Sequence, residues 1–274
     1  MRIARSITTL DPVDVGDHVC WLVGADDDVK STAGAFVADG ALFGDKVLII
    51  GSADAAWSKH HTAGNLITLD PKARRMGGGR WDADAMLGVV RREADTADRQ
   101  GFRALRVLAQ MHHVWPDGAA SDEVASHELD LDSLVADGGA ILVCSYRMDR
   151  FTPGALEQAA GMHPQHLGVG GSLTPSFRLY NEGADCWSVH GVIDIEGVST
   201  FRTAVGELMA RRELVRLRCE GLQLMDASGM VALAEAARAL PGRRLFLEGA
   251  NNTLRRCWEL LGYDSAEIPE EMAP

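Results

Sequence analysis

The sequence predicts an α/β fold in two parts: an N-terminal parallel sheet with helices on both faces, and a smaller C-terminal α/β domain. Apolar segments typical of buried strands alternate with helical patterns along the chain. The length of 274 residues fits two domains, at roughly 150 residues each. The segment 164–175 (PQHLGVGGSLTP) is rich in Gly and Pro and has no sustained apolar period, which marks a boundary.

Five apolar segments of the first part are expected to be strands: 18–23, 46–50, 65–69, 104–109 and 140–146. Helical patterns lie between them, at 29–43, 82–99, 121–136 and 153–162. The strand segments are apolar almost throughout, as in parallel sheets that are buried on both faces. We therefore predict a first domain at 1–165 and a linker at 166–176.

The second domain is expected to span 177–274. Two strands at 177–180 and 187–195 are joined by a turn at 181–183. They are followed in order by a helix at 198–211, a strand at 214–219, a helix at 228–240, a strand at 244–248 and a helix at 252–261. Pro241-Gly242 and Gly262 follow the last two helices, where such residues end helices. This order forms a compact α/β module by itself.

Charge and cysteine content restrict the function classes. The net charge is 27 − 39 = −12, and both halves are acidic, so neither nucleic acid nor an anionic membrane surface is an expected partner. No apolar run is long enough to span a bilayer, and no apolar segment of a signal peptide follows the N-terminus, so we expect a cytoplasmic protein. The five cysteines are widely spaced and show no metal-ligand spacing, so no disulfide, metal or cofactor is expected.

The segment 224–230 (LMDASGM) is the most informative local motif. A strand ends near residue 222 and a helix begins near Ser228, so Asp226 is placed to cap that helix. A hydroxyl here lies at the positive end of a helix, where a phosphate finds unpaired N–H donors. The simpler interpretation is that Asp226 and Ser228 only cap the helix.

Three blocks, 187–194 (WSVHGVID), 225–229 (MDASG) and 245–249 (LFLEG), resemble the STAS domain over about residues 177–265. That fold occurs in bacterial anti-sigma-factor antagonists and at the cytoplasmic ends of sulfate transporters. In the regulatory members, a partner kinase phosphorylates a Ser directly after the Asp, a position held here by Ala227. The resemblance implies a partner-binding surface that consists of Asp226, Ala227, Ser228, Gly229 and Met230. Ser228 is the candidate phosphoacceptor of this surface.

Residues 14–166 resemble the MEDS sensory domain, whose fold is like the RecA/KaiC core. The matching blocks are 16–20 (GDHVC), 101–103 (GFR), Trp115, His127-Glu128, 142–146 (LVCSY), Arg150-Phe151 and 162–164 (MHP). Gln110-Met111 departs from the family, which often has an acidic residue before Met. The resemblance implies a ligand-sensing domain without an established reaction. The candidate sensory pocket contains Asp17, His18, Cys20, Glu128, Cys144, Tyr146, Arg150 and His163.

Two further patterns argue against catalysis or metal binding. The segment 24–31 (GADDDVKS) mimics a phosphate-binding loop, but Val29 replaces a required Gly and three Asp would repel a phosphate. The pairs His60-His61 and His112-His113 are expected on strands, where neighbours face opposite sides and cannot clamp a metal. His18 and His163 could also simply mark the end of a strand and of a helix.

These observations predict a signalling protein rather than an enzyme. A sensory domain, which binds an unknown small molecule, is coupled to a STAS module that binds an anti-sigma factor or a GHKL-type kinase. By competition, this module would regulate a sigma factor and thereby transcription. Two alternatives stay open: a nucleotide-binding or nucleotide-hydrolysing enzyme on the RecA-like domain, and a scaffold that is not phosphorylated, as Ala227 favours.

Overall fold

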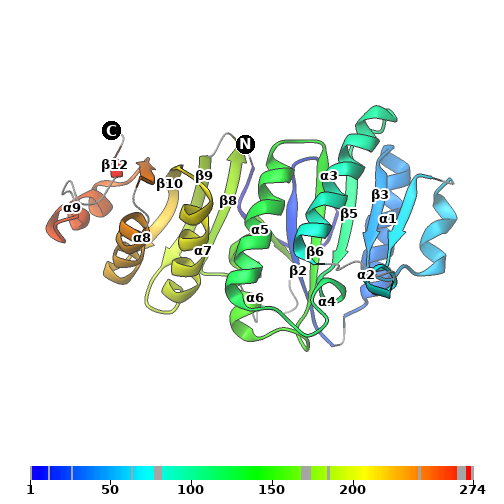
Figure 1. Cartoon of the computed structure of the whole chain (residues 1–274), viewed down its shortest axis with the longest axis horizontal. Helices are drawn as coiled ribbons and strands as arrows, with labels where there is room; N and C mark the ends of the chain where they lie inside the picture. Colours follow the sequence, from blue (N-terminus) through cyan, green and yellow to red (C-terminus); the bar gives the residue numbers. More distant parts are fainter. Residues whose placement is uncertain are drawn as a thin grey trace.

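The structure of the protein is a computed structural model. It describes residues 2–11, 13–25, 27–62, 64–76, 82–167, 174–183, 186–239, 242–263 and 270–272. Two sheets lie one after the other along the molecule, each with its own helices (Figure 1). The predicted α/β class is confirmed for both parts.

The first sheet has seven strands in the order β1-β7-β2-β6-β5-β3-β4, and all neighbours are parallel. The strands are β1 (Arg5–Ile7), β2 (His18–Val23), β3 (Lys46–Ile50), β4 (Leu66–Leu69), β5 (Leu105–Gln110), β6 (Ala140–Arg147) and β7 (Gln165–Leu167). The helical segments are α1 (Val29–Phe43), η1 (Ala55–His60), α2 (Pro71–Met76), α3 (Ala83–Arg99), α4 (Met111–Val114), α5 (Ser121–Ala136) and α6 (Pro153–Gly161).

Two hydrophobic clusters cover opposite faces of this sheet, because side chains alternate along each strand. Val19 and Trp21 of β2 pack on the α1 side with Phe36. Cys20 of β2 and Cys144 of β6 point to the other face, into the cluster that includes residues of α3, α5 and α6. That second face carries the polar residues described below.

The second sheet has the order β12-β11-β10-β9-β8, in which only the β8–β9 pair is antiparallel. Its strands are β8 (Phe177–Gly183), β9 (Cys186–Ile193), β10 (Leu214–Met225), β11 (Arg244–Glu248) and β12 (Glu270–Met272). Its helices are α7 (Val198–Arg211), α8 (Ala227–Ala239) and α9 (Asn252–Leu260).

The two domains share a packed interface. Leu129 of α5 and Met162 after α6 belong to the same hydrophobic cluster as Trp187 of the second domain. Across the same boundary, Arg211 of α7 forms an ion pair with Asp130 of α5 at 2.9 Å. Figure 1 accordingly shows α5 and α6 beside α7 and β8.

Several elements differ from the sequence prediction. Strand β7 extends to Leu167, so the segment expected as a linker from residue 166 begins inside the first sheet. Asn181 to Gly183 continue β8 instead of forming a free turn, and β10 continues to Met225 through two shifts of register.

The histidine pairs were wrongly expected on strands. His112 and His113 lie on helix α4 with ring centroids 4.4 Å apart, and His60 ends η1.

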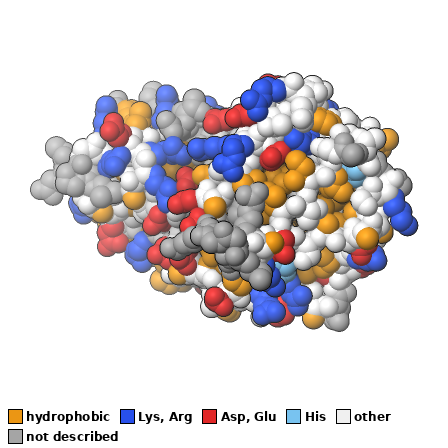
Figure 2. Space-filling model, turned by 45° about the vertical axis from the view of Figure 1, so that its right-hand side comes forward, with side chains coloured by type: hydrophobic (Ala, Val, Ile, Leu, Met, Phe, Trp, Pro, Cys, Tyr) orange, Lys and Arg blue, Asp and Glu red, His pale blue; other side chains and the backbone are white. Residues whose placement is uncertain are grey.

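The face in Figure 2 carries charges of both signs, with Lys and Arg side chains lying among Asp and Glu side chains. Within the described part of the chain, we find no helix long and apolar enough to cross a membrane.

Candidate functional site

A cluster of buried polar side chains lies between the first sheet and its covering helices. His18 begins β2, Cys144 and Tyr146 lie on β6, Glu128 lies on α5, and His163 follows α6. All five side chains are completely buried. β2 and β6 pair in register, with Cys20 opposite Cys144 and Leu22 opposite Tyr146, so His18, Cys144 and Tyr146 project from one face.

Four side chains of this cluster converge on one point. Glu128 Oε2 lies 3.3 Å from His18 Nε2 and 3.3 Å from His163 Nε2. Cys144 Sγ lies 3.5 Å from His18 Nε2 and 3.6 Å from Glu128 Oε2. All four atoms are within 4.8 Å of one another, an arrangement that could hold a metal ion.

Three members of this group, both histidines and Glu128, are each held in place by a further hydrogen bond. His18 Nδ1 is 2.9 Å from Asp132 Oδ1, and His163 Nδ1 is 2.6 Å from the carbonyl oxygen of Ala159. The Tyr146 hydroxyl donates to Glu128 Oε1. With both Nδ1 atoms bonded to acceptors, the two Nε2 lone pairs point at the centre of the group.

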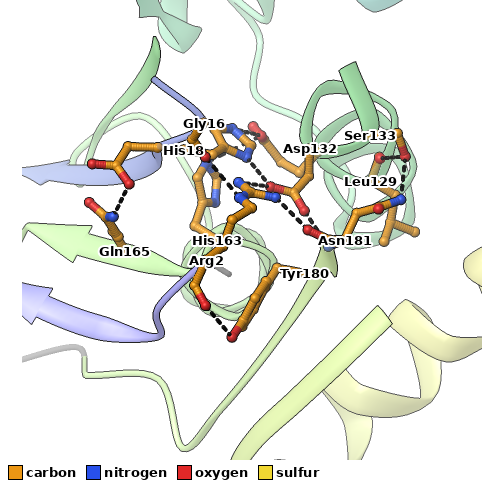
Figure 3. Close-up of polar contacts among 12 residues, drawn as sticks. Arg2, Gly16, His18, Leu129, Asp132, Ser133, His163, Gln165, Tyr180 and Asn181 are labelled. Carbon is orange, nitrogen blue, oxygen red and sulfur yellow. Dashed lines mark hydrogen bonds and ion pairs between the residues drawn. The ribbon is translucent and has the colours of Figure 1, made fainter. Parts of the chain in front are cut away.

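Asp132 also connects the buried cluster to the second domain (Figure 3). Its Oδ1 accepts a hydrogen bond from Arg2 Nη2 at 2.6 Å, and its Oδ2 accepts one from the backbone N–H of Asn181 in β8 at 2.5 Å. Arg2 in turn donates to the carbonyl oxygens of Gly16 at 2.8 Å and Asn181 at 2.7 Å. One carboxylate therefore contacts both His18 in the buried cluster and the interface between the domains.

The electrostatics follow from this network. Burial opposes ionisation of Asp132, but Arg2 and His18 outweigh it and lower the pKa of Asp132 to about 2. Burial also disfavours the charged form of His18, yet hydrogen bonds to Asp132 and Glu128 raise its pKa. Burial and the neighbouring His18 lower the pKa of His163 to about 3, so His163 is neutral at physiological pH.

The structure brings together most of the predicted sensory pocket. His18, Cys20, Glu128, Cys144, Tyr146 and His163 are all buried on one face of the sheet. Asp17 is half-buried beside them, and its carboxylate accepts a hydrogen bond from Gln165. Arg150 is exposed in the turn after β6, outside the cluster.

The predicted partner surface lies at the start of α8 in the second domain. Asp226 Oδ1 accepts hydrogen bonds from the backbone N–H of Ser228 at 2.8 Å and of Gly229 at 3.1 Å, so Asp226 caps the helix. The Ser228 hydroxyl also donates to Asp226, and with these N–H groups it lowers the pKa of the Asp226 carboxyl.

Only part of that motif reaches the surface. Ala227 is exposed and Asp226 and Ser228 are half-buried, whereas Gly229 and Met230 are buried beneath them. Two apolar side chains close to the motif in the fold are exposed instead: Leu224, which is 50% exposed, and Ile195, which is 73% exposed and whose N–H hydrogen-bonds Asp226.

The loop that mimics a phosphate-binding loop is occupied by its own side chains. Asp27 Oδ2 accepts the N–H of Gly24 at 2.6 Å, and Asp28 Oδ1 accepts the N–H of Ser31 at 3.0 Å. Lys30 is directed to Asp54, with which it pairs at 2.8 Å. The N–H groups of Gly24 and Ser31 and the ammonium group of Lys30 are therefore already bonded to carboxylates.

Comparison with protein-family models assigns both domains. Residues 17–164, more than half of the chain, match the MEthanogen/methylotroph, DcmR Sensory domain (MEDS). The chain belongs to the MEDS family. Residues 181–271 match the STAS domain, so the order of the two predicted resemblances is confirmed. No curated protein matches the chain.

The buried cluster thus lies in the MEDS domain and the α8 surface in the STAS domain. Both are signalling domains, so the chain combines a sensory domain with a STAS module like those of anti-sigma factor antagonists. STAS domains interact with proteins such as anti-sigma factors or kinases.

Sequence reasoning missed several residues of these two regions. Asp132 had a usable signal, because it lies four positions after Glu128 and therefore on the same face of α5. Arg2 and Asn181 had no such local signal in the sequence, because their contacts with Asp132 span 130 and 49 positions. In the STAS domain, the exposed side chains of Leu224 and Ile195 were also missed.

Proposed function

We propose that this MEDS–STAS chain is a sensor–transducer that regulates a sigma factor by partner switching. In the proposed mechanism, the STAS domain binds an anti-sigma factor of the GHKL kinase fold and thereby releases the sigma factor. The observation that carries the proposal is the exposure at the start of α8: Ala227 is exposed, Leu224 three residues earlier is 50% exposed, and Ile195, whose N–H hydrogen-bonds Asp226, is 73% exposed. Exposed apolar side chains near the segment that family members use for docking favour a protein-binding site.

In this mechanism, the MEDS domain detects the signal by binding a ligand. A ligand of the MEDS domain can change partner binding by the STAS domain only if the ligand binds one arrangement of the two domains more tightly than another. Asp132 offers the physical connection, because one carboxylate contacts His18 in the buried cluster, Arg2, and the N–H of Asn181 in β8. A ligand of the MEDS domain that displaces His18 would thereby alter the contacts that hold β8.

Ser228 is the candidate phosphoacceptor, but its surroundings favour docking without a phosphoswitch. Its hydroxyl donates to Asp226 and is half-buried, and the usual acceptor position is the methyl group of Ala227. Incubation with the partner kinase and ATP, followed by mass spectrometry, tests this point. Phosphate on wild type that is lost in Ser228→Ala would establish a phosphoswitch at Ser228.

Direct binding to a purified GHKL-fold anti-sigma factor from the same genome tests the docking surface. Ala227→Glu adds a negative charge at an exposed helix start, where the helix dipole tolerates it. Thr253→Glu adds the same charge in the first turn of α9 and serves as the matched control. We expect Ala227→Glu to weaken binding at least tenfold, whereas Thr253→Glu binds like wild type. Equal binding by both variants would contradict the proposed surface.

A further inference from the structure

We propose that the buried group of His18, Glu128, Cys144 and His163 is a four-coordinate site for a divalent transition metal, with zinc as the ion that fits it best. The ligand atoms would be Nε2 of both histidines, Sγ of Cys144 and Oε2 of Glu128. This inference concerns the MEDS domain alone and does not depend on whether the STAS domain binds a partner.

Four of the six separations between these atoms match the edges of a zinc tetrahedron, and all six are within 4.8 Å. With Zn–N and Zn–O bonds of about 2.0–2.1 Å and a Zn–S bond of about 2.3 Å, a tetrahedron has N–O edges of about 3.3–3.4 Å and S–N or S–O edges of about 3.5–3.6 Å. The two N–O separations here are both 3.3 Å. The S–N and S–O separations are 3.5 and 3.6 Å.

The two contacts of Cys144 Sγ also have ordinary hydrogen-bond lengths for sulfur, but the two N–O distances to Glu128 are long for charged hydrogen bonds. A charged N–H to carboxylate hydrogen bond is about 2.7–2.9 Å long, well below the 3.3 Å seen to Glu128. His163 Nε2 is completely buried and finds no hydrogen-bond partner among the described residues. A buried nitrogen lone pair without a partner is costly, and a metal ion at the centre would satisfy it.

The surrounding contacts are those that metal-binding side chains usually have. Ligating histidines commonly donate their other ring N–H to a carboxylate or a backbone carbonyl, which fixes the ring and its tautomer. Asp132 does this for His18 and the carbonyl of Ala159 does it for His163. The hydroxyl of Tyr146 holds the second oxygen of Glu128, so all the polar ligands but the thiol are oriented from outside.

The ligand set points to the kind of ion. A thiolate together with two imidazoles favours zinc over magnesium or calcium, which prefer oxygen ligands. Cys144 would bind as the thiolate and release its proton to solvent. Because four protein atoms complete the coordination and the group is completely buried, the site suits a structural ion that enters during folding.

The test uses the full chain without a histidine tag, expressed with zinc or with cobalt(II) as the added metal. Mass spectrometry of the metals should find about one zinc per chain in wild type. The cobalt form should show the absorption of a four-coordinate ion with a thiolate–cobalt charge-transfer band. Wild type that carries no stoichiometric zinc and shows no such band would overturn the proposal, as would stoichiometric iron or copper in place of zinc.

A pair of cysteine variants locates the thiolate. Cys144→Ala should lose the charge-transfer band and most of the metal. Cys20→Ala is the matched control, because Cys20 is the buried register partner of Cys144 but is not one of the four ligands. Retention of the band in Cys144→Ala, or its loss in Cys20→Ala, would overturn the assignment. If circular dichroism shows that Cys144→Ala does not fold, His163→Gln is used, with loss of the metal expected and retention contradicting the site.

Discussion

Replacement of Arg2 by alanine tests the connection between the two domains. Arg2 donates three hydrogen bonds, to Asp132 at 2.6 Å, to the carbonyl of Asn181 at 2.7 Å and to the carbonyl of Gly16 at 2.8 Å. Removing one partner of a buried ion pair costs about 3–5 kcal/mol. The side chain of Arg2 is 12% exposed, and Asp132 keeps its hydrogen bonds with His18 and with the N–H of Asn181. We therefore expect Arg2→Ala to lower the free energy of unfolding by about 3 kcal/mol, the low end of that range.

Arg256→Ala is the matched control, since it removes an exposed arginine. Its side chain is 70% exposed and its 3.1 Å pair with Glu259 lies within one turn of α9, so we expect a loss of about 0.5 kcal/mol or less. Guanidinium unfolding followed by tryptophan fluorescence gives the free energy of unfolding for each variant. Hydrogen exchange should also be faster at the Asn181 N–H in Arg2→Ala only. A difference between the two variants below about 0.5 kcal/mol would refute the coupling role of Arg2.

Two further predictions concern stability and use the same denaturation assay. A Cβ at Gly229 would lie 2.7 Å from Ile193 Cγ2 and 2.8 Å from Met225 Cγ, so Gly229→Ala should destabilise the chain by about 1–3 kcal/mol. Gly206→Ala in α7 meets no described atom within 4 Å and should be neutral or stabilising; equal losses in both would contradict the packing argument. Asp45→Ala leaves the fully buried Arg106 without its 2.9 Å carboxylate partner and should cost about 3–5 kcal/mol. Asp149→Ala, which breaks an exposed pair with Arg147, should cost about 0.5 kcal/mol or less. A similarly small cost for Asp45→Ala would contradict the expectation that the buried ion pair contributes more to stability than the exposed one.

The long elements of the fold could be predicted because their signals are local. The helix expected at 29–43 is found at Val29–Phe43, and it ends at Gly44, which adopts the left-handed conformation at φ 75°. The strand expected at 18–23 is found at His18–Val23, where every residue is buried. Such segments carry their own start, end and periodicity.

The short elements were missed because their causes are not local. Strand β7 is three residues long, and only its pairing with β1 and β2 makes it a strand. Helix α4 has four residues directly after β5, too few to show a helical period. The extension of β10 to Met225 passes through register shifts and exposed polar residues that obscure the strand alternation.

The buried cluster illustrates the same limit for the site. The sequence contained no ligand spacing, because His18, Glu128, Cys144 and His163 come from four separate parts of the chain. The family resemblance named these four residues, but their convergence on one point follows only from parallel pairing of β2 with β6 beneath α5 and α6.

Release of a sigma factor is the measurement that tests the sensor–transducer proposal most directly. A purified complex of the sigma factor and its GHKL-fold anti-sigma factor is titrated with the MEDS–STAS chain, and the free sigma factor is measured by size-exclusion chromatography. Wild type and Thr253→Glu should release the sigma factor, whereas Ala227→Glu should release little even at high concentration. A complex that stays intact with wild type, or that Ala227→Glu dissociates equally well, would contradict partner switching through the start of α8.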